Sequence, residues 1–573
     1  MINILSFLSK LTKFSNLVGV FYATFKKVMN TDIFYFKGGE INKNLCYIKL
    51  DYNLTKKVLF SLIALIGILT TGFAQKPNIL YIVADDAGLD MSAYGRKWVN
   101  TPAFDRIAKE GILFQNAYTP NAKCAPSRAC MLTGRNPWQL DAAMNHSIFF
   151  PNYFRTYPEV LNENGYFVGY TGKGYAPGKA FKEDGSKRDM LIKEFSTLKI
   201  IPPTKEISNN DYAGNFGAFL KASDSNKPWA FWLGFTEPHR AYEYGSGVAK
   251  AGKKVDMIDR IPKYYPDSDT TRNDLLDYAM EIEYMDSHVA RVLKILEESG
   301  QLKNTLIVFT SDHGMPFPRV KGNQYLNSNH IPFAVMWKNG IKNAGRIVTD
   351  YVNMTDLAPT FLEVAGITPQ KSGMRPITGK SLVSIFNSTK SGQIEAARDF
   401  QLVGQERHDF GRPKDVGYPV RGMHKNGFLY LKNYEPDRWP ACNPETGYLN
   451  CDGGPVKSLL LDHRRNGLDK YYWQLSFGKR PGEELYDLSK DPDCVNNLAQ
   501  NSKYQAIKKS LEKEMEAKLL AQGDLRMQGY GHLYEQYPGA EINGFYERFM
   551  KGEKFKLGWV NESDFEREVI KDK

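Results

Sequence analysis

The chain has 573 residues, of which 42% are hydrophobic and 24% are charged, and its formal net charge is +11. This length allows two or more domains with a substantial buried core, and the composition excludes a disordered chain. The sequence has no evident internal repeat, which disfavours solenoids and propellers.

Residues 55–74 have the layout of a secretory signal peptide. Lys56 and Lys57 precede an apolar run, and small residues follow that run up to Ala74. The run is short for a membrane span, so we predict cleavage after Ala74 and export, to the periplasm or into the medium. An uncleaved membrane anchor is the alternative. Residues 1–54 are rich in Asn, Lys, Phe and Tyr, which suggests an over-long gene model or an unstructured extension.

The rest of the chain is weakly basic and poor in cysteine. Without the first 75 residues, which hold nine Lys and three acidic residues, the formal net charge falls from +11 to +5. This balance suits an anionic substrate. Six cysteines are too few for a disulfide scaffold. Export makes disulfides possible, and we expect Cys442 and Cys451, which enclose Asn-Pro-Glu-Thr-Gly, to form one.

Four apolar, β-rich runs each end in a polar cluster. The runs cover residues 78–84, 166–171, 229–235 and 306–311, and the clusters begin at Asp85, Gly172, Thr236 and Asp312. Such runs indicate strands buried on both faces. Helical patterns lie between them, the best from Leu275 to Ser299. We therefore predict an α/β fold, with a mostly parallel sheet sandwiched by helices.

The polar clusters indicate one shared site. In parallel sheets of this kind, ligands bind outside the carboxyl ends of the strands, and all four clusters lie there. A single pair of acidic residues would more often be a solvated turn. Four coincident clusters favour a common site instead.

The pattern of predicted elements changes near residue 390, beyond which shorter strands and turns are indicated. We predict an α/β domain at residues 75–390 that carries the site, and a smaller α+β domain at residues 391–525. A helix from about Lys503 to Gln522 closes the second domain. Residues 526–573 form a C-terminal tail that is aromatic and charged.

The segment from Cys124 to Arg128 reads Cys-Ala-Pro-Ser-Arg. Pro126 suits the first turn of a helix and Gly134 suits the position just past a helix end, so Cys124 should lie at a helix N-terminus. Backbone N–H groups and the helix dipole favour an anion there. A lone cysteine would more often be part of the core, but its neighbours change that interpretation.

The pattern Cys-x-Pro-Ser-Arg resembles the segment by which formylglycine-dependent type I sulfatases are recognised. The resemblance implies an alkaline-phosphatase-like fold, and oxidation of Cys124 to formylglycine (3-oxoalanine) by a formylglycine-generating or sulfatase-maturating enzyme. The hydrated aldehyde would then be the nucleophile, because loss of a proton from its second hydroxyl expels sulfate. Arg128, one helical turn on, would hold the diol and the anion.

Three acidic residues at strand ends are candidate metal ligands. Asp85, Asp86 and Asp312 offer hard oxygen atoms, which suit Ca²⁺ or Mg²⁺. The sulfatase resemblance implies one Ca²⁺ ion, held by these residues and by His313. Many relatives have Asn at the last position, and imidazole is a poorer calcium ligand. We therefore expect His313 to act as a ligand or as a sulfate contact.

Lys173, His239 and Lys321 match the positions that neutralise sulfate and protonate the leaving oxygen in the family. One departure matters here. The histidine that usually follows the lysine by two residues is replaced by Tyr175. We therefore expect His239 to be the proton donor to the leaving oxygen.

Further segments resemble the heparan N-sulfatase (sulfamidase) branch, which also includes bacterial sulfatases similar to those acting on ulvan and other algal polysaccharides. They are residues 238–240, 309–318, 406–409, 418–421 and 484–492. The favoured expectation is an O-sulfatase of an ulvan-type polysaccharide or its oligosaccharides, and the alternative is hydrolysis of glucosamine N-sulfate. The expected sugar contacts are Glu237, Arg240, Arg407, His408, Asp409 and Arg421.

Two other classes of protein are alternatives. A phosphatase or phosphodiesterase of the same superfamily would share the sheet and the acidic clusters, but it should carry Ser or Thr as nucleophile, and Cys124 argues against it. An inactive carbohydrate-binding relative would tolerate loss of the site, whereas here every central position is filled. We expect no nucleic-acid partner and no stable membrane anchor.

Overall fold

The computed structural model describes residues 76–540, 542–568 and 570. The expected extension at 1–54 and the signal peptide at 55–74 lie outside these residues. Within the described part of the chain, no helix is both long enough and apolar enough to cross a lipid bilayer.

A seven-stranded sheet forms the larger core. Its strands are β1 (Asn78–Ala84), β2 (Ile112–Tyr118), β4 (Phe167–Gly172), β6 (Trp229–Gly234), β7 (Thr305–Ser311), β8 (Phe333–Met336) and β9 (Arg346–Asn353), in the order β4-β6-β1-β7-β8-β2-β9. Only β8 in this sheet pairs with its neighbours in the antiparallel sense. The four predicted strands β4, β6, β1 and β7 are parallel neighbours, so their carboxyl ends lie side by side.

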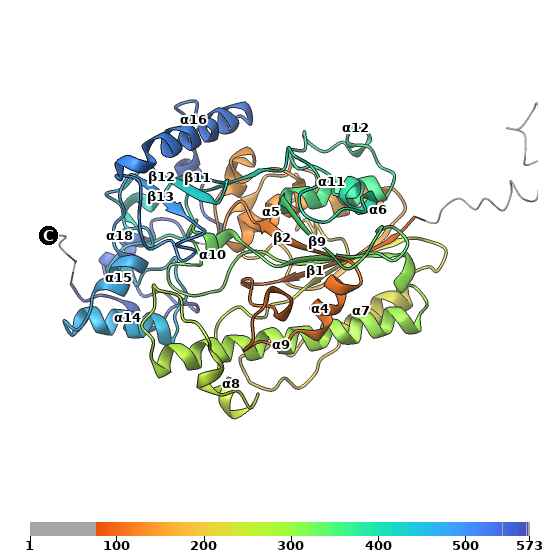
Figure 1. Ribbon diagram of the computed structural model, residues 1–573, viewed down its shortest axis with the longest axis horizontal. Coiled ribbons are helices and arrows are strands. Elements are labelled where there is room, and N and C mark those ends of the chain that lie inside the picture. Colours follow the sequence, from red (N-terminus) through yellow and green to blue (C-terminus); the bar gives the residue numbers. More distant parts are fainter. Residues whose placement is uncertain (1–75, 541, 569, 571–573) are drawn as a thin grey trace, which may run out of the picture. The chain divides into compact units, whose positions relative to one another are not determined.

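Helices cover both faces of this sheet (Figure 1). One face carries α4 (Pro102–Lys109), α7 (Tyr212–Ala222) and α9 (Asp269–Glu298), and the other carries α5 (Cys124–Thr133), α6 (Tyr157–Glu163) and α11 (Leu357–Val364). Alternate residues of β1 enter the two cores, Leu80 and Ile82 on one side and Tyr81 and Val83 on the other. The predicted α/β sandwich is thus confirmed.

Helix α9 begins six residues before the predicted start at Leu275. Ser268 caps it, because its side chain accepts a hydrogen bond from the backbone N–H of Thr271. The first turn is polar and therefore lacks the apolar periodicity on which the prediction relied.

The second sheet is antiparallel and has four strands, β10 (Phe400–Gln405), β11 (Val420–Lys425), β12 (Phe428–Asn433) and β13 (Glu483–Asp487). Helix α16 (Gln505–Ala521) packs on it, with Leu511, Met515 and Leu519 buried against Met423 and Tyr430. This is the smaller α+β part that the sequence predicts.

The C-terminal segment also packs against the protein. Helix α17 (Leu533–Gln536) and helix α18 (Phe545–Met550) follow α16, and Phe545 is buried with Phe410 and Leu449. The remaining short elements are β3 (Phe149–Phe150), β5 (Lys179–Ala180), α8 (Ser246–Ala249), α10 (Leu326–Asn329), α12 (Pro369–Ser372), α13 (Val383–Asn387), α14 (Pro455–Arg465) and α15 (Tyr471–Phe477).

The expected disulfide between Cys442 and Cys451 is wrong. Both residues are buried free thiols. The Sγ atom of Cys442 donates to the backbone carbonyl of Asp409 at 3.5 Å, and that of Cys451 to the carbonyl of Asp452 at 3.6 Å. Burial raises the pKa of Cys451 to about 11, so both thiols are held in the protonated, unreactive form.

We predict that unfolding the protein in denaturant with iodoacetamide, and without reductant, labels both Cys442 and Cys451. Peptide mass spectrometry would measure the labelling, and Cys130, a third buried thiol, serves as the internal control. Labelling of the pair only after reduction would contradict the structure.

Candidate active site

The site lies at the carboxyl edge of the four neighbouring strands. Asp85 and Asp86 follow β1, Lys173 follows β4, His239 lies beyond β6, and Asp312 follows β7. Because these strands are parallel and adjacent, the residues that follow them meet at one edge of the sheet.

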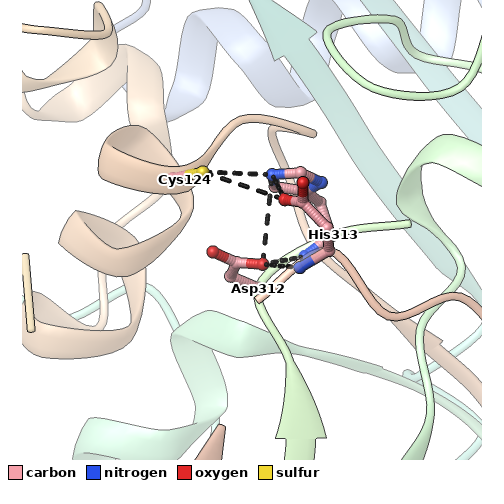
Figure 2. Close-up of side chains that lie close together, drawn as sticks. Cys124, Asp312 and His313 are labelled. Carbon is pink, nitrogen blue, oxygen red and sulfur yellow. Dashed lines mark hydrogen bonds and ion pairs between the residues drawn. The ribbon is translucent and has the colours of Figure 1, made fainter. Parts of the chain in front are cut away.

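Helix α5 presents Cys124 to this edge. Cys124 is the first residue of the helix, and Gly134 ends the helix with a φ of 68°. The Sγ atom lies 3.4 Å from Nε2 of His313 and 3.9 Å from Oδ1 of Asp86. Figure 2 shows the side chains of Cys124, Asp312 and His313 converging from α5 and from the end of β7.

Four of these residues form a buried cluster with metal-binding potential. Ligand atoms of Asp86, Cys124, Asp312 and His313 all lie within 4.8 Å of one another, and Asp85 lies as close to Cys124 and His239. Burial, reinforced by the charge of Asp85, raises the pKa of Asp312 to about 7. A divalent cation would favour the ionised carboxylate, and the carboxylate oxygens of Asp85, Asp86 and Asp312 are the part of this cluster that fits a hard cation.

Arg128 joins the acidic residues to each other. Its guanidinium is buried and donates to Oδ2 of Asp312 at 2.9 Å and to Oδ1 of Asp85 at 3.1 Å. The same group donates to the backbone carbonyls of Lys173 and Gly174. In this arrangement Arg128 holds the candidate metal ligands, whereas the sequence predicted a contact with the diol and the anion.

The cationic groups of the site surround Cys124. Lys173 forms an ion pair with Asp85, and Nζ of Lys321 donates to Asp86 at 2.7 Å and to Nε2 of His239 at 2.9 Å. Burial alone would raise the pKa of the Cys124 thiol, but the positive charge of Lys173 helps to lower it well below its usual value. The electrostatic field around Cys124 therefore favours an anion.

Asp452 also belongs to the site, although the sequence analysis does not predict it. Its carboxylate accepts from Nζ of Lys321 at 2.5 Å and lies 3.8 Å from Nε2 of His239. It follows Cys451 in a loop, where Cys-Asp-Gly-Gly reads as an ordinary turn. No local pattern could have indicated that this loop reaches the site.

A cavity of about 330 Å³ opens over Cys124. One part of its lining is polar and charged and consists of Lys123, Cys124, His146, Ser147, Lys173, His239, Lys321, Asp409 and Asp452. The other part is mostly apolar and consists of Ala176, Pro177, Phe410, Leu449, Ile542, Phe545, Leu557 and Trp559. The apolar wall thus comes largely from loops and C-terminal residues that follow the main sheet in the chain.

Three of the expected sugar contacts lie in or beside this cavity. Asp409 lines it, while Glu237 and Arg240 line a neighbouring cavity of about 230 Å³ that shares Lys173 and His239. Glu237 accepts from the hydroxyl of Tyr212 at 2.8 Å. The guanidinium of Arg240 is paired with both carboxylate oxygens of Asp274, at 2.8 and 2.7 Å.

The other three expected contacts do not line either cavity. Arg407 donates to backbone carbonyls, including that of Tyr537, and Nε2 of His408 lies 2.8 Å from Oδ1 of Asn121. Arg421 is fully buried and paired with Asp524 and Glu406. Their polar groups serve the protein interior, so we correct the expectation and do not retain Arg407, His408 and Arg421 as sugar contacts.

With this geometry established, the comparison with known proteins gives the family. The family model described as Sulfatase matches residues 77–367. This range covers half of the chain and includes Cys124, the acidic cluster and the lysines. The protein belongs to the sulfatase family and is an enzyme of that class.

Curated relatives and solved structures agree with this assignment. An ulvan-active sulfatase of Formosa agariphila is 27% identical over 78% of this chain and 76% of its own length. Human N-sulphoglucosamine sulphohydrolase is 26% identical over 79% of this chain and 91% of its own. A protein solved with its substrate D-glucosamine-2-N,6-O-disulfate has the same fold, with a TM-score of 0.53 and 19% identity over 82% of this chain and all of that one.

We predict that Arg421→Met destabilises the protein by about 3–5 kcal/mol, because Asp524 would keep a buried charge without its ion-pair partner and Glu406 would keep only its pair with Arg526. Urea denaturation followed by circular dichroism would measure the change. The matched control is Lys490→Met. The ammonium of Lys490 pairs with Asp487 but the side chain is 72% exposed, so this variant should unfold at nearly the same urea concentration as the wild type. An Arg421→Met variant with unchanged stability and a raised KM for an oligosaccharide would restore this residue to the sugar site.

Proposed function

We propose that this protein hydrolyses sulfate esters on a sulfated polysaccharide or its oligosaccharides, using Cys124 after its oxidation to formylglycine. The observation that carries the proposal is the position of Cys124. It lies at the N-terminus of α5, beside a buried acidic cluster, in a cavity lined by lysine and histidine side chains. A sulfate bound there would meet the helix dipole and several positive charges.

The residues present fit the formylglycine that the family implies. Hydrated formylglycine would supply two hydroxyl groups, one to attack sulfur and one to release sulfate afterwards. Its oxygen would also replace a sulfur atom that is a poor ligand for a hard cation. Oxidation of Cys124 requires a formylglycine-generating or sulfatase-maturating enzyme as partner during biosynthesis.

We propose one Ca²⁺ ion held by Asp85, Asp86, Asp312 and His313. Such an ion would supply positive charge opposite the sulfate oxygens. The protein's own cations complete this task, because Lys173, Lys321 and Lys123 all line the same cavity. Together these charges would stabilise the negative charge that develops as the S–O bond breaks.

The lining of the cavity supports a glycan substrate. The apolar wall with Phe410 and Trp559 offers surface for the C–H face of a sugar ring, and the charged wall accepts the sulfate. The similarity to an ulvan-active sulfatase favours an O-sulfated algal polysaccharide. Glucosamine N-sulfate is the second candidate substrate. The similarity to human N-sulphoglucosamine sulphohydrolase, which aligns over 91% of its length, supports it. Glu237, Arg240 and Asp409 remain as proposed sugar contacts.

A secreted or periplasmic location fits a polysaccharide substrate or its oligosaccharides. We retain the proposed signal peptide at 55–74, the sulfatase domain at 75–390, the smaller domain at 391–525 and a C-terminal tail at 526–573.

The first experiment measures the mass of the peptide that contains Cys124, together with sulfate release from ulvan oligosaccharides and from glucosamine N-sulfate. We expect the mass of formylglycine and release from the ulvan oligosaccharides. Cys124→Ala should keep the fold and release sulfate only at background level. Release by an enzyme whose cysteine is unmodified would overturn the proposed nucleophile, and release from glucosamine N-sulfate alone would select the second substrate.

We further predict that Ca²⁺ raises the melting temperature of protein stripped with a chelator. A ligand at about 100 times its Kd stabilises the native state by about 2.7 kcal/mol, which differential scanning fluorimetry detects. Asp312→Asn should abolish most of this shift. Equal shifts in the wild type and in this variant would place the ion elsewhere.

A further inference from the structure

His146 lines the same cavity as Cys124, Lys173 and His239. It lies between the short 3-10 helix η3 (Asp141–Met144) and strand β3. Its backbone N–H donates to the carbonyl of Arg407 at 3.1 Å, which fixes the loop. The residue is only 8% exposed, so its ring is held in the cavity wall and is not a mobile surface group.

The ring of His146 has one nitrogen engaged and one free. Nδ1 lies 3.0 Å from Oδ1 of Asp409, and because a carboxylate only accepts, Nδ1 carries a proton. Nε2 is buried and has no hydrogen-bond partner among the described residues. A buried polar atom without a partner is costly. Where such an atom belongs to a residue that lines a ligand cavity, it points to a bound group that completes the hydrogen bond.

The carboxylate of Asp409 holds the ring of His146 in place. Burial would raise the pKa of Asp409, but the positive charges of Lys123 and His146 lower it below its usual range. Nζ of Lys123 lies 2.7 Å from Oδ2 of Asp409, so the carboxylate stays ionised between the two groups. The carboxylate therefore accepts the Nδ1–H of His146 and fixes the orientation of its ring. The nearby His408 ring is kept neutral by burial, which lowers its pKa.

The expected proton donor, His239, is engaged differently. Its Nδ1 lies 2.5 Å from the carbonyl of Arg240 and therefore carries the proton of that ring. Its Nε2 then accepts from Lys321 and has no proton to donate. Tyr175, two residues after Lys173, is no substitute, because burial raises the pKa of its hydroxyl far above the ordinary value.

We propose that His146 is a further catalytic residue, which donates the proton on Nε2 to the leaving oxygen of the sulfate ester, and that Asp409 is its positioning residue. This role rests on the proposed hydrolysis of sulfate esters. As sulfur bonds to the nucleophile proposed at residue 124, its bond to the leaving oxygen breaks. The electron pair stays on the leaving oxygen, which takes the proton. His146 becomes neutral, keeps its Nδ1–H bond to Asp409, and regains a proton from water.

The test is the variant His146→Asn in the matured, full-length enzyme. The Asn amide nitrogen can occupy the position of Nδ1 and keep the bond to Asp409, while the free Nε2 is deleted. Substituted phenyl sulfates of increasing leaving-group basicity, with ulvan oligosaccharides as the alkyl sulfate, report on protonation. We expect kcat/KM to fall by about 10²–10⁴-fold for the most basic leaving groups, and by less than about tenfold for nitrophenyl sulfate.

Two further variants separate catalysis from structure. His424→Asn removes another buried histidine, one that does not line the cavity and whose ring nitrogens are likewise unpartnered within the described chain. It should change kcat/KM by the same factor for every substrate. Asp409→Asn should weaken the hold on Nδ1 of His146, so its loss of kcat/KM should also grow with the basicity of the leaving group, as expected of a positioning residue.

The outcomes are distinct. An equal loss for all leaving groups in His146→Asn, or no loss, would overturn the role of His146. A wild-type enzyme that hydrolyses phenyl sulfates but no glycan would overturn the proposed substrate, and the phenyl sulfate series would still decide the role of His146. A wild-type enzyme with verified formylglycine that hydrolyses no sulfate ester would overturn both.

Discussion

The pairing of buried charges is the constraint on which the rest of the active site depends. Asp85 and Asp312 share the guanidinium of Arg128, and Asp86 is paired with Lys321. An unpaired buried charge costs several kcal/mol. Each acidic side chain therefore fixes the position of its basic partner, and each basic side chain fixes the position of its acidic partner. A divalent cation bound to the same oxygens would compete with the lysines, and would thereby turn their ammonium groups toward a sulfate.

The sheet and the smaller domain contribute different parts of the cavity. The charged groups follow the strands β4, β6, β1 and β7. The reaction requires these groups at fixed distances from one another. The apolar wall, with Phe410 and Trp559, comes from loops and from C-terminal residues. Loops tolerate change better than strands do. The fold therefore allows the surface that is proposed to contact the sugar to vary while the groups around Cys124 stay in place.

Periodicity, burial and capping are local properties, so the sequence predicts strands β1, β4, β6 and β7, helices α5, α9 and α16, and the acidic residues at the strand ends. Strand β1 spans the predicted residues, for instance. His146 and Asp452 could not be predicted, because each acts beside a partner that is distant in the sequence, Asp409 and Lys321. Arg421 shows the opposite error. Within a motif it resembles an anion contact, but its burial between Asp524 and Glu406 makes it part of the interior.

The C-terminal wall of the cavity also determines when Cys124 can be reached. In the folded protein Cys124 is 2% exposed, and residues such as Phe545 and Trp559 lie over the same cavity. These residues leave the ribosome long after Cys124, since synthesis proceeds from the N-terminus. An enzyme that carries out the proposed oxidation and needs an extended segment around Cys124 would therefore have to act during synthesis or translocation. The pace of translation and export would set the fraction of molecules that become active.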